Sequence, residues 1–169
     1  SSSSRSATGT ADSAIITTSE AFRAVPQALD VHVFLDPTLG AMTHAVISID
    51  KRDDAEPMAV IEAAFAARLA LGGSDMPVSM LTKRIVVVDA DVDVHQLADV
   101  DWAVWTRTAA AGKFRVLPDV PTWNLERCAK PGRGALRLAV DATCDLEDRA
   151  KLRRPRIPGA QRIRLEDYL

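Results

Sequence analysis

Apolar and polar residues alternate in two short segments near the start of the chain. Residues 31–35 read VHVFL and residues 44–49 read HAVISI, so every second side chain would face a core. Alternation of this kind predicts β-strands with one buried face. The link between the two segments is short and begins with the turn residues Asp36 and Pro37. We therefore expect them to pair as antiparallel strands.

A continuous apolar run predicts the central strand of the domain. Residues 84–89 contain four consecutive β-branched side chains, which is typical of a strand buried on both faces. A helix over residues 97–108 should follow, with acidic residues at its amino end, where the helix dipole favours negative charge. Two further strands are predicted over residues 114–117 and 136–140, the first running into a proline-bounded loop at 118–121.

Two more helices are predicted from the pattern. Residues 15–29 suit a helix, which Pro26 should end or kink. Residues 57–71 suit a longer one, because Pro57 fits a first helical turn and the glycine pair at 72–73 would stop it. Helices that alternate with strands in this way indicate a single small α/β domain, in which a mixed sheet is flanked by helices on both faces.

The two ends of the chain differ from this central domain, which we place at residues 14–145. Residues 1–13 are almost all small and polar, so they lack apolar surface to offset the entropy of ordering, and we expect a disordered arm. Residues 146–169 include seven basic residues between 149 and 164. We expect this segment to be an extended tail that docks on an acidic partner surface.

Composition narrows the function classes. The chain has 169 residues, 47% of them hydrophobic and 26% charged, as in ordinary globular proteins. A net charge of -2 gives no reason to expect nucleic acid as a partner. No apolar run approaches the roughly 20 residues that span a bilayer. The two cysteines, Cys128 and Cys144, have no metal or redox spacing, so we expect a cytoplasmic protein.

Six local motifs, in order, closely resemble the carboxy-terminal domain of the UbiD-type decarboxylases, which use prenylated flavin. The resemblance covers about residues 14–156. The motifs are LDVHV at 29–33 with HAVISIDK at 44–51, an alanine-rich helix at 55–71, TK at 82–83, DADVDV at 89–94 with DVDWAVWTR at 99–107, DVPTWNL at 119–125 and LAVDAT at 138–143.

The resemblance implies a chain that works with a partner. Family members carry a flavin-binding domain ahead of this one, and that domain has no counterpart in residues 1–169. The chain therefore resembles the small subunit of a hetero-oligomeric decarboxylase that acts reversibly on an aromatic, heteroaromatic or α,β-unsaturated carboxylic acid. The large subunit would hold prenylated FMN, a divalent metal (Mn or Mg), possibly K, and the catalytic acid residues. The small subunit alone should be inactive.

Four positions of this chain match substrate-facing positions of the family. Leu81 and Lys83 alternate on the strand before the acidic turn, and Lys83 could hold a carboxylate or phenolic oxygen. Trp123 and Leu125 match a mobile lid that stacks on the substrate and excludes water. The structural alternatives are an ordinary lysine, solvated or paired with Asp91, and a surface tryptophan packed against its own domain.

Asp89, Asp91 and Asp93 allow other interpretations. A strand followed by this triplet also occurs in haloacid-dehalogenase-type phosphatases, where the first aspartate is the nucleophile, and it begins like a calcium loop, although Val94 replaces the required glycine. We favour a structural role, in which these carboxylates cap the next helix and pair with Arg107 or Lys83. A non-catalytic regulatory or assembly module is a further alternative for the whole chain.

Two other groups of residues carry weaker signals. Trp102 and Trp105 would share one helical face, which is more often a core or interface. The three histidines, His32, His44 and His95, are dispersed and show no metal spacing.

Overall fold

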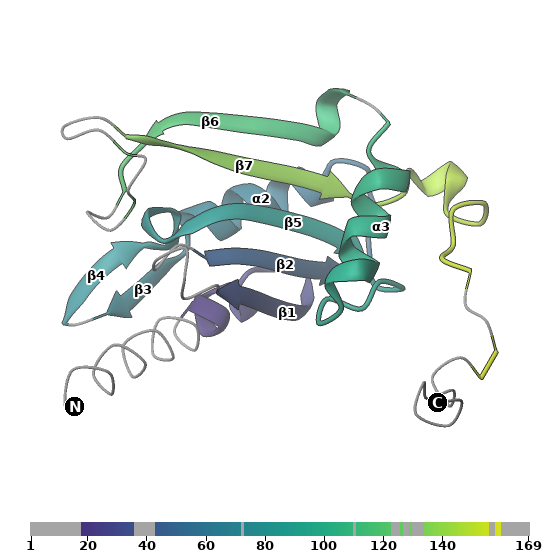
Figure 1. The fold of residues 1–169 in the computed structure, drawn as a ribbon, viewed down its shortest axis with the longest axis horizontal. Helices are drawn as coiled ribbons and strands as arrows, with labels where there is room; N and C mark the ends of the chain where they lie inside the picture. Colours follow the sequence, from purple (N-terminus) through teal and green to yellow (C-terminus); the bar gives the residue numbers. More distant parts are fainter. Residues whose placement is uncertain are drawn as a thin grey trace, which may run out of the picture.

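Figure 1 shows the fold of the chain as a computed structural model. The structure describes residues 18–35, 43–71, 73–109, 111–122, 126, 129, 134–155 and 158–159. No helix in this part of the chain has the length and hydropathy that crossing a membrane requires.

A five-stranded sheet forms the centre of the domain, in the order β1-β2-β5-β7-β6. Its three inner strands run parallel and both edge strands are antiparallel to their neighbours. The predicted mixed sheet and the antiparallel β1–β2 pair are therefore confirmed. The strands are β1 (Ala28–Leu35), β2 (Thr43–Ile49), β5 (Thr82–Asp89), β6 (Phe114–Val120) and β7 (Ala135–Ala142).

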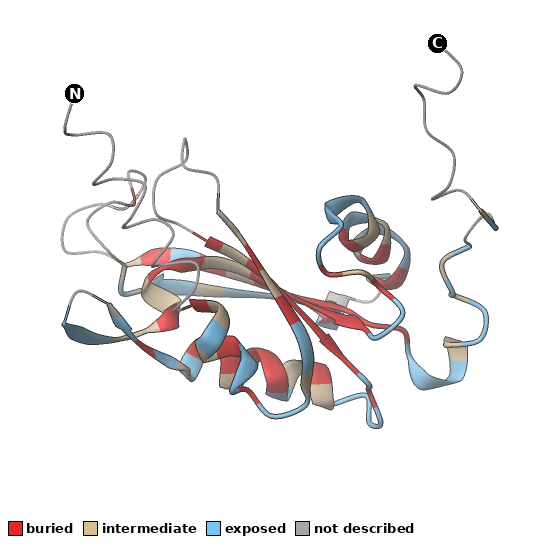
Figure 2. Ribbon diagram, turned by 90° about the horizontal axis from the view of Figure 1, so that it is seen from below, coloured by how far each residue is buried: buried red, intermediate tan, exposed pale blue. Residues whose placement is uncertain are grey.

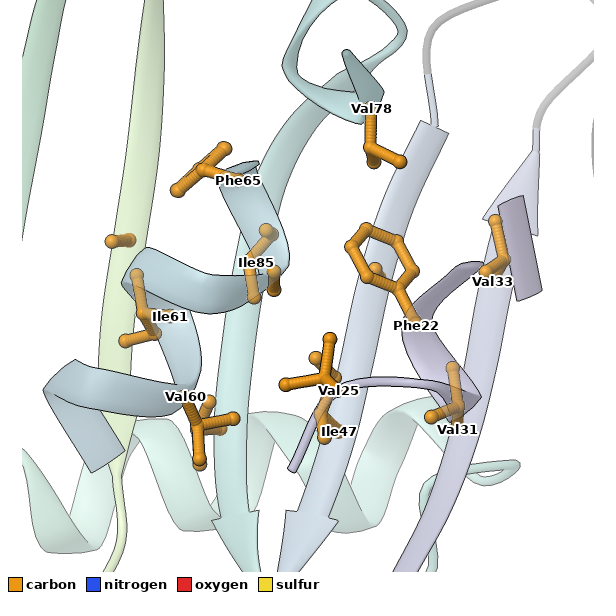
Figure 3. Packing of buried hydrophobic residues seen from close by; sticks show 14 of the residues in the cluster. Phe22, Val25, Val31, Val33, Ile47, Val60, Ile61, Phe65, Val78 and Ile85 are labelled. Carbon is orange, nitrogen blue, oxygen red and sulfur yellow. The ribbon is translucent and has the colours of Figure 1, made fainter. Parts of the chain in front are cut away.

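Helices cover both faces of the sheet, as predicted (Figure 2). The helix α2 (Glu56–Ala66) and the helical residues 18–23 pack on one face, and α3 (Leu97–Arg107) packs on the other. Strand β5 is buried between the two layers because its alternate β-branched side chains enter different cores. Figure 3 shows the larger core, to which Phe22, Val25, Val31, Val33, Ile47, Val60, Ile61, Phe65, Val78 and Ile85 contribute.

The prediction of a helix over residues 57–71 was wrong in its second part. Helix α2 ends at Ala66, and the chain becomes extended at Ala67, with a ψ of 149°. The strand β3 (Arg68–Leu71) then pairs with β4 (Ser74–Pro77) in a separate hairpin. In the connection between these two strands Gly73 adopts a φ of +80°, which favours glycine.

Two other boundaries differ from the predictions. The first helix ends at residue 23 and β1 already begins at Ala28, so residues predicted as helical belong to a strand. Strand β6 continues through Pro118 to Val120, where a loop was predicted. Proline is tolerated there because β6 is an edge strand, and its register shifts between Leu117 and Val120.

Candidate functional site

A buried charged network lies at the end of the sheet where the central strand β5 begins. The Lys83 ammonium group forms an ion pair with the Glu126 carboxylate, and Arg137 of β7 donates from Nη1 to Glu126 Oε2 at 3.0 Å. The Thr122 hydroxyl donates to the same carboxylate. One carboxylate thus joins β5 and β7 to the segment that follows β6.

The surroundings keep Glu126 ionised. Burial alone would raise the pKa of this carboxyl group, but hydrogen bonds from Lys83 and Thr122 and the charge of Arg137 outweigh it. Together they lower the pKa of Glu126 to about 2. The network is therefore a charged one at neutral pH.

Arg137 is completely buried and tied to the backbone around it. Its Nε donates to the Ser79 carbonyl at 2.6 Å, and Nη1 also donates to its neighbour's carbonyl, that of Leu136, at 3.0 Å. A buried guanidinium needs this many acceptors because each unpaired donor would carry a desolvation cost. The arrangement fixes the turn between the short helix η2 (Val78–Met80) and β5.

The four residues predicted from the resemblance fall in different environments. Leu81 is completely buried in the larger core, and its carbonyl accepts a hydrogen bond from the Thr43 amide at 2.8 Å. The Lys83 side chain is 37% exposed at the edge of the network. Trp123 and Leu125 lie outside the described residues, so the lid stays a prediction.

Sequence reasoning missed Glu126 and Arg137. Neither residue belongs to a recognisable motif, and Glu126 is 43 positions from Lys83 in the chain. A charged residue within the apolar strand pattern of β7 was the one available signal, because arginine enters a core only with partners.

The pairing predicted for the acidic triplet is confirmed for Arg107 and wrong for Lys83. Arg107 Nη1 donates to Asp89 Oδ2 at 3.0 Å, and Nη2 donates to Asp91 Oδ2 at 2.8 Å. Asp93 accepts a hydrogen bond from the His95 amide at 2.9 Å, and helix α3 has no side-chain cap. The predicted capping role is therefore also wrong.

A pocket of about 270 Å³ lies at the other end of the sheet, where β5 finishes, beside this triplet. Asp89 lines it but is buried, and it also accepts hydrogen bonds from the Cys144 amide at 2.7 Å and from Arg149. A carboxylate held by so many donors is a poor nucleophile, which argues against the phosphatase interpretation.

The fold brings two of the three dispersed histidines together. His95 Nδ1 lies 3.0 Å from His32 Nδ1, and His95 Nε2 lies 3.0 Å from Asp30 Oδ2. Within the described ranges, no three His, Cys, Asp or Glu side chains are arranged to hold a metal ion. The two tryptophans predicted to share a helical face have different environments. Trp102 lies under the Arg107 guanidinium, whereas Trp105 is 85% exposed.

Comparison with known proteins places these features in a family. Residues 13–142 match the model of the 3-octaprenyl-4-hydroxybenzoate carboxy-lyase C-terminal domain, UbiD_C. Anhydromevalonate phosphate decarboxylase of Aeropyrum pernix is 35% identical over 137 residues, which are 81% of this chain and 28% of that protein. The Methanothermobacter thermautotrophicus protein of the same name is 31% identical over 66% of this chain and 24% of its own length.

Solved structures agree with the family match. The UbiD-class enzyme HmfF of Pelotomaculum thermopropionicum, in complex with FMN, has a TM-score of 0.66 at 29% identity, over 94% of this chain and 32% of its own. The vanillic acid decarboxylase ShVdcCD of Sedimentibacter hydroxybenzoicus, in open form, has a TM-score of 0.60 at 18% identity, over 88% of this chain and 30% of its own, and shows the shared fold. The chain thus spans about a third or less of these relatives, and it belongs to the UbiD family as a carboxy-terminal domain.

Proposed function

We propose that this chain supplies the substrate-pocket wall and lid of a UbiD-like decarboxylase whose larger part holds the cofactor. The reaction would be the reversible removal of carbon dioxide from an aromatic, heteroaromatic or α,β-unsaturated carboxylic acid. The family match over residues 13–142 carries this proposal. Because the chain spans 28% of the Aeropyrum relative, most of such an enzyme must come from elsewhere.

The larger part, as a partner subunit in a hetero-oligomer, would hold prenylated FMN and a divalent metal. FMN or prenylated FMN is present in the HmfF structures. When bound, this flavin supplies an electron sink for the loss of carbon dioxide. The present chain would instead bind and orient the acid and exclude water from it.

Lys83 is the residue of the described network best suited to contact the substrate. Its ammonium group has three donors, and its side chain is partly exposed at the sheet edge. A substrate carboxylate could share this cation with Glu126. Leu81 would support the wall from within the core, since its side chain is completely buried.

Trp123 and Leu125 would form the lid beside this wall. Glu126 follows them directly in the sequence and is tied to both β5 and β7. Because its ion pairs hold Glu126 in place, it would anchor one end of the lid while the residues before it open and close. Closure of an aromatic lid would orient a flat acid and remove water from the reacting centre.

The curated relatives suggest which acids to test first. Four of the relatives found by sequence are named anhydromevalonate phosphate decarboxylase. We therefore place anhydromevalonate phosphate beside an aromatic acid in the first substrate panel.

The test is carbon dioxide release by the chain alone and by the chain assembled with its flavin-bearing part. We expect turnover in the assembled enzyme alone. Trp123→Ala and Lys83→Met should each lower kcat/KM at least about tenfold, as expected when one positioning contact is lost. Lys151→Met is the control, because its exposed side chain pairs with Asp148 near the chain's end.

Three outcomes would contradict parts of this proposal. Turnover by the isolated chain would refute the division of labour. An assembled enzyme that releases no carbon dioxide from any acid in the panel would refute the activity. Unchanged kinetics in both variants would instead favour the regulatory or assembly module.

A further inference from the structure

One face of the sheet is only partly covered by the described helices. Helix α3 lies over the end of the sheet where the parallel strands finish, and the other half of this face has no described helix above it (Figures 1 and 2). Strand register aligns one residue from each strand across that half. We call these five residues the cross-sheet row: Phe34, His44, Arg84, Leu138 and Val116.

The row has a cation at its centre. Arg84 Nη2 lies 3.0 Å from His44 Nδ1. A guanidinium can only donate, so His44 accepts at Nδ1 and carries its proton at Nε2. Burial, together with the charge of Arg84, lowers the pKa of His44 to about 3, so the ring is neutral at physiological pH. His44 therefore gives Arg84 an acceptor but no counter-charge.

Arg84 has no carboxylate partner among the described residues. Asp101 of α3 acts on it only at longer range, and no ion pair forms. The two more deeply buried arginines differ in this respect, because Arg107 binds Asp89 and Arg137 binds Glu126. Burial of a guanidinium without an opposite charge is costly. His44 Nε2 is a second buried donor that has no acceptor in the described part of the chain.

Apolar side chains surround this cation. The Phe34 ring stacks on His44 with 5.3 Å between centroids, and Leu138 is half-buried on the other side of Arg84. At the β6 edge, Val116 is 54% exposed, and Leu136, two residues before Leu138 in β7, is 48% exposed. Five strands at a spacing of about 4.8 Å make a surface roughly 19 Å wide, which is the scale of a protein contact.

We propose that the cross-sheet row is a docking surface for the flavin-bearing part of the enzyme, which presents a carboxylate to Arg84 between apolar side chains. This inference rests on the proposed function for the identity of the partner. Two observations support it. The half-buried Arg84 has no opposite charge paired with it among the described residues, and a carboxylate on the partner would supply one. The present chain covers 32% of the HmfF chain, which leaves a larger part to dock. A second copy fits poorly, because a symmetric contact centred on the row would place two Arg84 cations together.

The test compares charge reversals on opposite faces of the same sheet. In Arg84→Glu, the new carboxylate would face the partner's carboxylate, and association with the flavin-bearing part should weaken about 30-fold or more. Arg84→Lys should lose far less, because it keeps the charge. Arg115→Glu is the matched control, since Arg115 faces α2 and pairs with exposed Glu62, and it should associate like the wild type.

A labelling experiment covers the case in which both parts belong to one polypeptide. In the assembled enzyme, a cysteine at Val116→Cys should react with maleimide at least about tenfold more slowly than in the isolated chain, because the partner would cover it. Leu29→Cys is the control, because Leu29 is 61% exposed on β1 and lies outside the row. Its labelling rate should not change on assembly.

The outcomes separate the two proposals. If the wild-type enzyme assembles and turns over, but Arg84→Glu associates normally and Val116→Cys is not protected, the docking surface is wrong and the function stands. If the wild-type chain binds no flavin-bearing part at all, both are wrong. Protection that appears in the isolated chain at high concentration would identify a second copy as the occupant and overturn the inference.

Discussion

Glu126 is a residue whose ionisation the fold controls directly, because its carboxylate is buried and contacts Lys83, Thr122 and Arg137. In Glu126→Gln, two cations would lose their counter-charge while Arg137 stays buried. We expect the free energy of unfolding to fall by about 2–4 kcal/mol at pH 7, measured by urea denaturation. Glu62→Gln, which removes an exposed ion pair, should change it by less than about 1 kcal/mol.

Glu126 should also make the stability of the fold depend on pH in the acidic range. Its pKa is about 2 in the fold and near 4.5 without the surrounding groups. A lowered folded pKa stabilises the fold above the unfolded value, and this contribution is lost as the pH falls through the folded value. Equal losses in wild type and Glu126→Gln between pH 4.5 and 2 would contradict the charged network.

His44 should make the stability of the fold depend on pH in a higher range than Glu126 does. Its pKa falls from 6.5 to about 3, chiefly through burial and then through Arg84. Between pH 6.5 and 3, His44 is protonated in the unfolded chain and neutral in the folded chain. The free energy of unfolding should therefore decrease as the pH falls through this range, by up to about 1.4 kcal/mol per pH unit. His44→Gln keeps an acceptor for Arg84 and should reduce this slope, measured by denaturation at pH 7, 6 and 5. An unchanged slope would show that His44 is not the titrating group.

At the scale of elements, the irregular end of the β6–β7 pair leaves no room for a larger side chain at Gly134. A Cβ atom added at Gly134 would overlap the backbone of Asp119, which has a φ of +55°. Gly134→Ala should therefore lower the free energy of unfolding by about 2 kcal/mol or more. Gly112→Ala is the control, because its Cβ would meet no atom within 4 Å, and it should stay within about 1 kcal/mol of the wild type. Similar melting of both variants would contradict the close approach.

The local pattern of apolar residues predicted β5 and α3 well, but it assigned the segment after Ala66 to the wrong type of element. Strand β5 and helix α3 were predicted to within two residues because their apolar periods are unambiguous. The segment after Ala66 was misjudged because RLAL fits a helix as well as a strand. Its pairing with β4 decides the outcome, and a pairing partner is not part of a local pattern.

At the scale of the whole molecule, the first part of the basic tail returns to its own domain. Arg149 donates to the Lys51 carbonyl at 2.9 Å, and the Leu152 carbonyl accepts from Arg107 at 2.8 Å. Arg154 pairs with Asp99 at 2.9 Å. These contacts join the tail to α3 and to the segment that follows β2. Docking of the later residues on a partner stays a prediction.

Two truncations test this attachment. A chain that ends at Asp148 should lose about 1–3 kcal/mol of unfolding free energy, because Arg107 and Asp89 each lose a partly buried hydrogen bond. A chain that ends at Gly159 keeps these contacts and should differ by less than about 0.5 kcal/mol. Thermal and urea unfolding of the two chains provide the measurement. Equal stability would show that the described tail contacts contribute nothing.

The sequence by itself determined the family, the α/β class and the positions of most strands, because each depends on neighbouring residues and on motifs in a fixed order. The pairing of Arg107 with the acidic triplet was also predicted, but only the tertiary structure decided the partners of Lys83 and Arg84. Lys83 meets Glu126 instead of Asp91, and Arg84 meets a neutral histidine instead of a carboxylate. Strand register and loop paths bring residues about 40 positions apart into contact. The partners of Lys83 and Arg84 therefore follow from the assembled sheet, and no local pattern contains that information.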